Sequence, residues 1–149
     1  MTSVRETIRC LTSEGTLNLQ DNRRNIVPEL SDKNISEHYF LRKTLQPNLV
    51  DLATASANED VVGLALIDAD LDDAINTGDI NLYLHKNYEF HKELYRLTDV
   101  TILETAADGS WMRYGPSLRV VCGRDGTLCL TDQHKETLTT MFLSDAEKA

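Results

Sequence analysis

The helical spacing of apolar residues from residue 31 onward constrains the fold most. Five amphipathic stretches, joined by short connections, predict helices at about 35–57, 59–76, 79–97, 100–121 and 131–143. Gly78 is expected to end the second of these, and residues 123–127 predict a turn between the last two. Amphipathic helices with short connections must cover one another's apolar faces, which predicts a mainly α fold built as an antiparallel helical bundle.

The first thirty residues have a different pattern. Residues 2–15 predict a short helix that is capped by Thr2 or Ser3 and ended by Gly15. In residues 16–30, apolar and polar residues then alternate on both sides of a charged tip, which predicts a two-stranded hairpin. Pro28 is expected to end its second strand. A helix followed by a hairpin is the second half of a winged helix-turn-helix.

Charge separates this front segment from the rest of the chain. The net charge is −9, but residues 1–30 balance four arginines against four acids, so the surplus of acid lies after residue 30. An acidic body repels phosphate, and only the front segment is therefore suited to DNA. Three cysteines without a C-x-x-C pair, and the lack of an apolar run of the ~18 residues that a membrane span needs, favour a cytoplasmic protein without membrane contact.

Polar residues interrupt two of the apolar stripes. Asn87 and His91 lie one turn apart on the stripe of the helix expected at 79–97, and His134 lies on the stripe of the last helix. Two inward histidines and an amide oxygen could hold a divalent ion, since imidazole suits Zn, Ni, Cu or Fe. The alternative is that these side chains are hydrogen-bonded core residues.

Arg42 is also expected to face inward, where a guanidinium needs an anion. Either a carboxylate of the body or that of a ligand could supply it. His38 and His85 are expected at the surface, and the aspartates at 68, 70, 72 and 73 mostly outward. No nucleophile–base pair, G-x-S-x-G motif or Walker loop is present, so an enzyme is not expected. A metal-dependent hydrolase would need a general base, which the sequence does not indicate.

Four segments resemble a known family of regulators. TSVRETIRCLTSEGTLNLQDNRRNIVPELS is similar to the recognition helix and wing of GntR transcriptional regulators. NISEHYFLRKTLQPNLVDLA, NYEFHKELYRLTDVTILETAADGSWMRYGPSLR and DQHKETL resemble the helical effector domain of the FadR subfamily, called FCD. The resemblance covers essentially the whole chain in order. It implies a partial winged helix-turn-helix at 1–30 and an effector-binding and dimerisation domain at 31–149.

The resemblance also implies roles for individual residues. We expect a homodimeric regulator that binds a DNA operator and a small organic acid, with a divalent metal such as Zn or Ni. The implied site residues are Thr2, Ser3, Arg5, Arg23 and Arg24 for DNA, Arg42 and Arg113 for the effector, and Asn87, His91 and His134 for the metal. We further expect a chain truncated at both ends, in which residues 145–149 begin a final helix that carries the last metal ligand past Ala149. The alternative is a truncated remnant that acts only in dimerisation or protein interaction.

Overall fold

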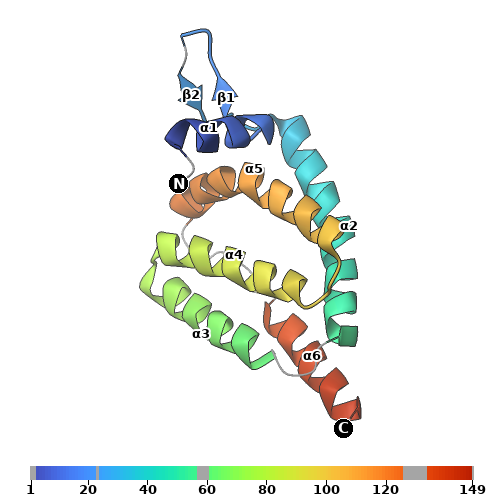
Figure 1. Ribbon diagram of the computed structural model, residues 1–149. Helices are drawn as coiled ribbons and strands as arrows, with labels where there is room; N and C mark the ends of the chain where they lie inside the picture. The colour runs from blue at the N-terminus through green and yellow to red at the C-terminus, as the bar shows by residue number, and fades with distance from the viewer. Residues whose placement is uncertain (1–2, 23, 57–60, 126–133, 149) are drawn as a thin grey trace.

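Helices dominate the computed structural model, which describes residues 3–22, 24–56, 61–125 and 134–148. The elements in chain order are α1 (Val4–Ser13), β1 (Asn18–Leu19), β2 (Asn25–Ile26), α2 (Asp32–Ser56), α3 (Val61–Thr77), α4 (Ile80–Arg96), α5 (Thr101–Asp125) and α6 (His134–Lys148). Figure 1 shows α3 and α4 running antiparallel, α5 on the other side of α4, and α2 along one edge, where it contacts α4, α5 and α6. The expected mainly α bundle is therefore confirmed.

The core forms where the apolar stripes of these helices meet. It includes Leu49, Leu64, Leu71, Phe90 and Tyr95, each of which is at most 1% exposed. Among the described residues, no helix is long and apolar enough to cross a membrane.

Three expectations about the helices were wrong. Helix α5 continues to Asp125, so residues 123–125 are helical rather than part of a turn, and the rest of that expected turn lies outside the described residues. A glycine within a helix costs only about 1 kcal/mol, so Gly123 does not end it. Residues 145–148 continue α6 and do not begin a new helix. Asp68 is buried and does not point outward, because it lies four residues after Leu64 and three before Leu71 on the same stripe.

The front segment lies at one end of the molecule, where α1 and the hairpin project beyond α5 (Figure 1). The hairpin pairs Asn18 with Ile26 and Leu19 with Asn25 in antiparallel register. Helix α1 has no fully buried residue, and Ser3, one of the two residues expected to cap it, occupies the N-cap position without a side-chain capping hydrogen bond. Gly15 directly follows the C-cap of α1 with φ at +73°, a left-handed conformation that favours glycine.

Candidate functional site

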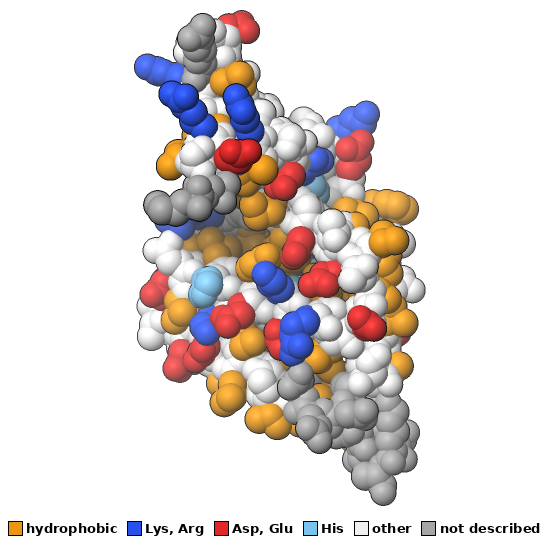
Figure 2. Space-filling model, in the orientation of Figure 1, with side chains coloured by type: hydrophobic (Ala, Val, Ile, Leu, Met, Phe, Trp, Pro, Cys, Tyr) orange, Lys and Arg blue, Asp and Glu red, His pale blue; other side chains and the backbone are white. Residues whose placement is uncertain are grey.

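A cavity of about 660 Å³ lies between α2, α4, α5 and α6. This volume is within the usual range for small-molecule sites. Helix α2 contributes the longest wall, from Ile35 to Asp51, and the other helices close the cavity with Phe90, His91, Leu94, Tyr95, Tyr114, His134 and Thr137. A second hollow of about 270 Å³ between α4 and α5 is lined mainly by apolar side chains and contains no charged residue, and Figure 2 shows a shaded orange depression there. The charged and polar groups that could recognise a ligand therefore lie in the larger cavity.

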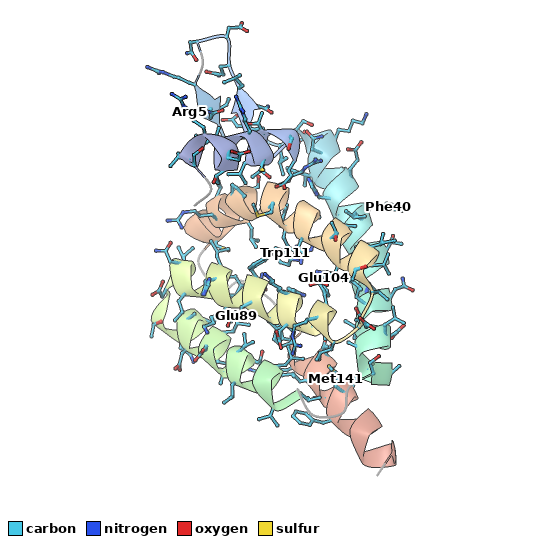
Figure 3. The ribbon with its side chains drawn as sticks, viewed as in Figure 1. Arg5, Phe40, Glu89, Glu104, Trp111 and Met141 are labelled. Atoms are coloured by element: carbon cyan, nitrogen blue, oxygen red, sulfur yellow. The ribbon has the colours of Figure 1, made fainter. Side chains whose placement is uncertain are left out.

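Arg42 lies in the α2 wall, with its guanidinium against two aromatic rings of α5. Its Cζ is 4.5 Å from the centre of the Trp111 ring and 5.5 Å from that of Tyr114. Figure 3 shows Trp111 between α5 and α4, at the centre of the bundle. Both rings stabilise the cation through their π faces. Arg42 lines the cavity, and its guanidinium, including the buried Nε, makes no hydrogen bond with another described residue, so the side chain keeps donors for an anion.

Two histidines from different helices meet in the same cavity. His91 Nε2 of α4 is 3.4 Å from His134 Nε2, at the start of α6. Each ring has a second partner on its Nδ1 side: the Tyr95 hydroxyl lies 3.5 Å from His91 Nδ1, and Asp68 Oδ1 lies 3.9 Å from His134 Nδ1. Gln46 Nε2 donates to the Tyr95 hydroxyl at 3.1 Å. A row of polar side chains therefore crosses the bundle from α2 through α4 and α6 to α3.

The electrostatics of this row favour an uncharged His91. Burial lowers the pKa of His91 well below its ordinary value of 6.5, and the nearby His134 and Arg42 lower it further. Burial also raises the pKa of the Tyr95 hydroxyl, which therefore stays protonated near neutral pH. A neutral imidazole with an unprotonated nitrogen is the form that binds a metal.

The geometry of the histidine pair fits a metal ion, but the pair does not form a complete ligand set. Two nitrogens bound to one tetrahedral zinc are about 3.4 Å apart, given Zn–N bonds of about 2.0–2.1 Å. Asn87 is buried one turn before His91 on α4 and is not among the residues that line the cavity. Within the described parts of the chain, no three His, Cys, Asp or Glu side chains are grouped so that they could hold an ion.

Arg113 lies away from the cavity, at the junction with the front segment. Its Nε and Nη2 donate to the Glu14 carbonyl at 2.9 and 2.6 Å, and its guanidinium packs against Gly15. Helix α5 therefore contacts the front segment through Arg113 and the cavity through the adjacent Tyr114. The structure does not bring Arg42 and Arg113 together in one site.

Of the residues expected to contact DNA, Ser3 and Arg5 lie on or beside α1, and Arg24 lies on the hairpin. Ser3, Arg5 and Arg24 are exposed, while Thr2 and Arg23 lie outside the described residues. Exposed Arg9 adds to the same positive surface, and Figure 2 shows blue side chains gathered at this end of the molecule. Red side chains are spread over the body.

The sequence interpretation missed two residues near the cavity. His38 was expected at the surface, but it lines the cavity, and its Nδ1 lies 3.0 Å from the Ser110 hydroxyl. Its position four residues before Arg42 places both on one face of α2, a signal that was available. For Asp68, which lies beside His134, the spacing from Leu64 and Leu71 could likewise have predicted an inward side chain.

Comparison with known proteins defines the family. A family model described as the FCD domain matches residues 37–149, so this chain belongs to the FCD domain family. The expected resemblance to FCD effector domains is thereby confirmed.

Solved structures support the same fold. The structure described as E. coli McbR/YncC is similar over 97% of this chain and 74% of that one, with 24% identity and a TM-score of 0.84. A second structure, described with the words "Lar controls the expression of the Listeria monocytogenes agr system and mediates virulence", is similar over 97% of this chain and 75% of that one, with 12% identity and a TM-score of 0.53. No curated protein is similar enough to this chain to count as a relative.

Proposed function

We propose that this protein is a DNA-binding transcriptional regulator of the GntR/FadR type that senses a small carboxylate metabolite. Membership of the FCD family and the position of a helix and hairpin at one end of the bundle support this proposal. Ser3, Arg5 and Arg24 are exposed on that end, where arginines can reach phosphates and a short helix can enter the major groove. The family resemblance adds Thr2 and Arg23 as proposed DNA contacts.

The single observation that carries the effector site is Arg42. Its guanidinium lies in the cavity lining, stacked on Trp111 and without a hydrogen bond to another described residue, so its N–H groups can meet a carboxylate that enters the cavity. A charge-assisted hydrogen bond in such a place is stronger than one in water. The acid would therefore bind with its carboxylate at Arg42 and its remaining atoms along the α2 wall.

A divalent ion such as Zn²⁺ or Ni²⁺ is a proposed cofactor of the same cavity. His91 and His134 would hold it, with Asn87 as the third candidate from the family resemblance. When bound, the ion would act as a Lewis acid that attracts an oxygen of the effector. Asp68 and Tyr95 would orient the two imidazoles from their Nδ1 sides, as outer partners commonly do.

An effector can regulate DNA binding only if its affinity differs between two arrangements of the protein. Helix α5 suits this role because consecutive residues, Arg113 and Tyr114, contact the front segment and the cavity. We propose that the working form is a homodimer whose two front segments bind one operator, since paired half-sites are the usual target of such motifs.

A two-part experiment tests the proposed function. The first part measures the melting temperature of the protein with a panel of small organic acids, with and without Zn²⁺ or Ni²⁺. The second is a gel shift with the DNA upstream of its own gene, together with molar mass by light scattering. We expect stabilisation by at least one acid, a dimer, and a DNA complex that the acid alters. A folded dimer without affinity for DNA or any acid would instead favour the role of an interaction remnant.

A further inference from the structure

The size of the cavity restricts the kind of acid that can fill it. A volume of about 660 Å³ is suited to a ligand of ten or more heavy atoms rather than to an acid of two or three carbons. The lining residues of α2 extend from Ile35 to Asp51, a length of about 24 Å at 1.5 Å per residue. The cavity is therefore elongated along α2, with Arg42 near its middle.

The walls beside Arg42 are mostly apolar or aromatic. On one side along α2 lie Ile35 and Tyr39, and on the other lie Pro47 and Val50. Phe90 and Leu94 of α4 also line the cavity, but at 0% and 1% exposure they offer almost no surface, so the apolar surface that a ligand can cover belongs mainly to these α2 residues. Such walls stabilise apolar ligand atoms, because binding removes both surfaces from water.

Several polar side chains in the lining already bind other protein groups. His38 is bonded to Ser110, Gln46 donates to Tyr95, and His91 contacts His134. Lys43 and Asp51 also line the cavity, but both are exposed at its rim, so ligand hydroxyls deeper in the cavity would have to break these contacts or stay without partners. Unpartnered polar groups in a buried site lower affinity strongly. Arg42 differs from these residues, because its buried Nε has no partner in the described part of the chain.

From this arrangement we infer that the effector is an acid with one carboxylate and an extended aliphatic or aromatic body, and not a polyhydroxylated sugar acid. The inference rests on the proposed function and names the chemical class of its ligand. The carboxylate binds Arg42, and the apolar body lies along the α2 wall against Pro47 and Val50.

Calorimetric titration of the full chain with three probes tests this inference. Octanoate has one carboxylate and an apolar body, gluconate has one carboxylate and a hydroxylated body, and 1-octanol has the apolar body without the charge. We expect octanoate to bind with a Kd about tenfold or more below those of gluconate and 1-octanol.

Matched variants assign the carboxylate to its anchor. Arg42→Gln should raise the Kd of octanoate by about tenfold or more. Lys43→Gln removes the same charge from the exposed rim of the cavity and should change the Kd of octanoate by less than about threefold. Arg42→Lys keeps the charge and removes the planar donor, so its Kd for octanoate should lie between those of the other two variants. If Arg42→Gln does not fold, Arg42→Lys takes its place.

The outcomes distinguish a failure of the inferred ligand class from a failure of the proposed effector site. Tighter binding of gluconate than of octanoate, with loss of affinity in Arg42→Gln, would overturn the inferred ligand class and leave the carboxylate site intact. Equal binding of 1-octanol and octanoate would show that Arg42 does not anchor the carboxylate. No binding of either acid would overturn the inference together with the proposed effector site.

Discussion

The contact between Arg113 and the Glu14–Gly15 corner can be tested with a pair of glycine variants. Gly15 and Gly78 both have left-handed backbones, with φ at +73° and +71°. A Cβ at Gly15 would lie 3.0 Å from Arg113 Nη2, whereas a Cβ at Gly78 would meet nothing within 4 Å. Gly78→Ala therefore carries the backbone strain alone, and Gly15→Ala carries the same strain plus the displacement of Arg113.

The expected magnitudes follow from these two contributions. An L-residue in the left-handed region costs about 1–2 kcal/mol. The two exposed hydrogen bonds from Arg113 to the Glu14 carbonyl stabilise the corner by about 1 kcal/mol, less than buried charged hydrogen bonds do. Gly15→Ala should thus cost about 2–3 kcal/mol, of which the Arg113 contact supplies about 1.

The cost of Gly15→Ala should appear locally, because α1 has no fully buried residue. We expect amide hydrogen exchange in α1 to accelerate by about thirtyfold or more, with little change in the melting temperature of the bundle. Gly78→Ala, between α3 and α4, should lower the melting temperature and leave exchange in α1 unchanged.

A double-mutant cycle isolates the contact. Arg113→Ala should accelerate exchange in α1 by about fivefold in the wild-type background. In the Gly15→Ala background it should have a smaller effect, because the guanidinium has to shift to make room for the Cβ. No acceleration by Arg113→Ala in the wild-type background would refute the view that this arginine attaches the front segment.

Three further predictions concern the bundle. Burial and the nearby Arg113 lower the pKa of His38, with Glu37 opposing them, so the unfolded state binds more protons than the folded state just below pH 6.5. The free energy of unfolding should therefore fall as the pH drops through that range. Urea unfolding at pH 7.5 and 5.5 should show a smaller loss of this free energy in His38→Gln than in the wild type. An equal loss in both proteins would contradict the assignment of this pH dependence to His38. Asp68→Asn should weaken Zn²⁺ or Ni²⁺ binding by about tenfold in a chelator competition, with exposed Asp73→Asn as the unaffected control. Leu71→Ala should lower the free energy of unfolding by about 2–5 kcal/mol in denaturant titrations, because this side chain is fully buried; a loss below 1 kcal/mol would contradict its place in the core.

The sequence could predict much of the fold because apolar spacing reports which side of a helix is covered. The stripe through Leu84, Asn87 and Leu94 correctly predicts a buried Asn87 and a His91 that points into the bundle. The proximity of His91 to His134 follows from the same reasoning applied to two helices. The division of the chain at residue 30 and the roles of the site residues stay predictions.

Other features depend on tertiary geometry that spacing does not contain. Arg113 belongs to a motif that suggested effector binding, yet its contact is with a carbonyl 99 positions earlier in the chain. Asp68 has three other aspartates close by in the sequence, and this acidic composition suggests an exposed side although the residue lies between Leu64 and Leu71 on the buried stripe. Tyr114 and Trp111 hold Arg42 only because α5 lies against α2, which the order of helices alone does not fix.

The sparse attachment of α1 has a consequence for how this protein can diversify. Since its side chains do not fill the interior, substitutions on its outer face leave the folding of the bundle largely untouched. If the front segment binds DNA and the cavity binds an acid, as proposed, DNA preference can change while the cavity stays constant, and the cavity can adapt to another acid without changes to the front segment. At the corner formed by Glu14 and Gly15, which contacts Arg113, substitutions in the front segment and in the bundle still constrain one another.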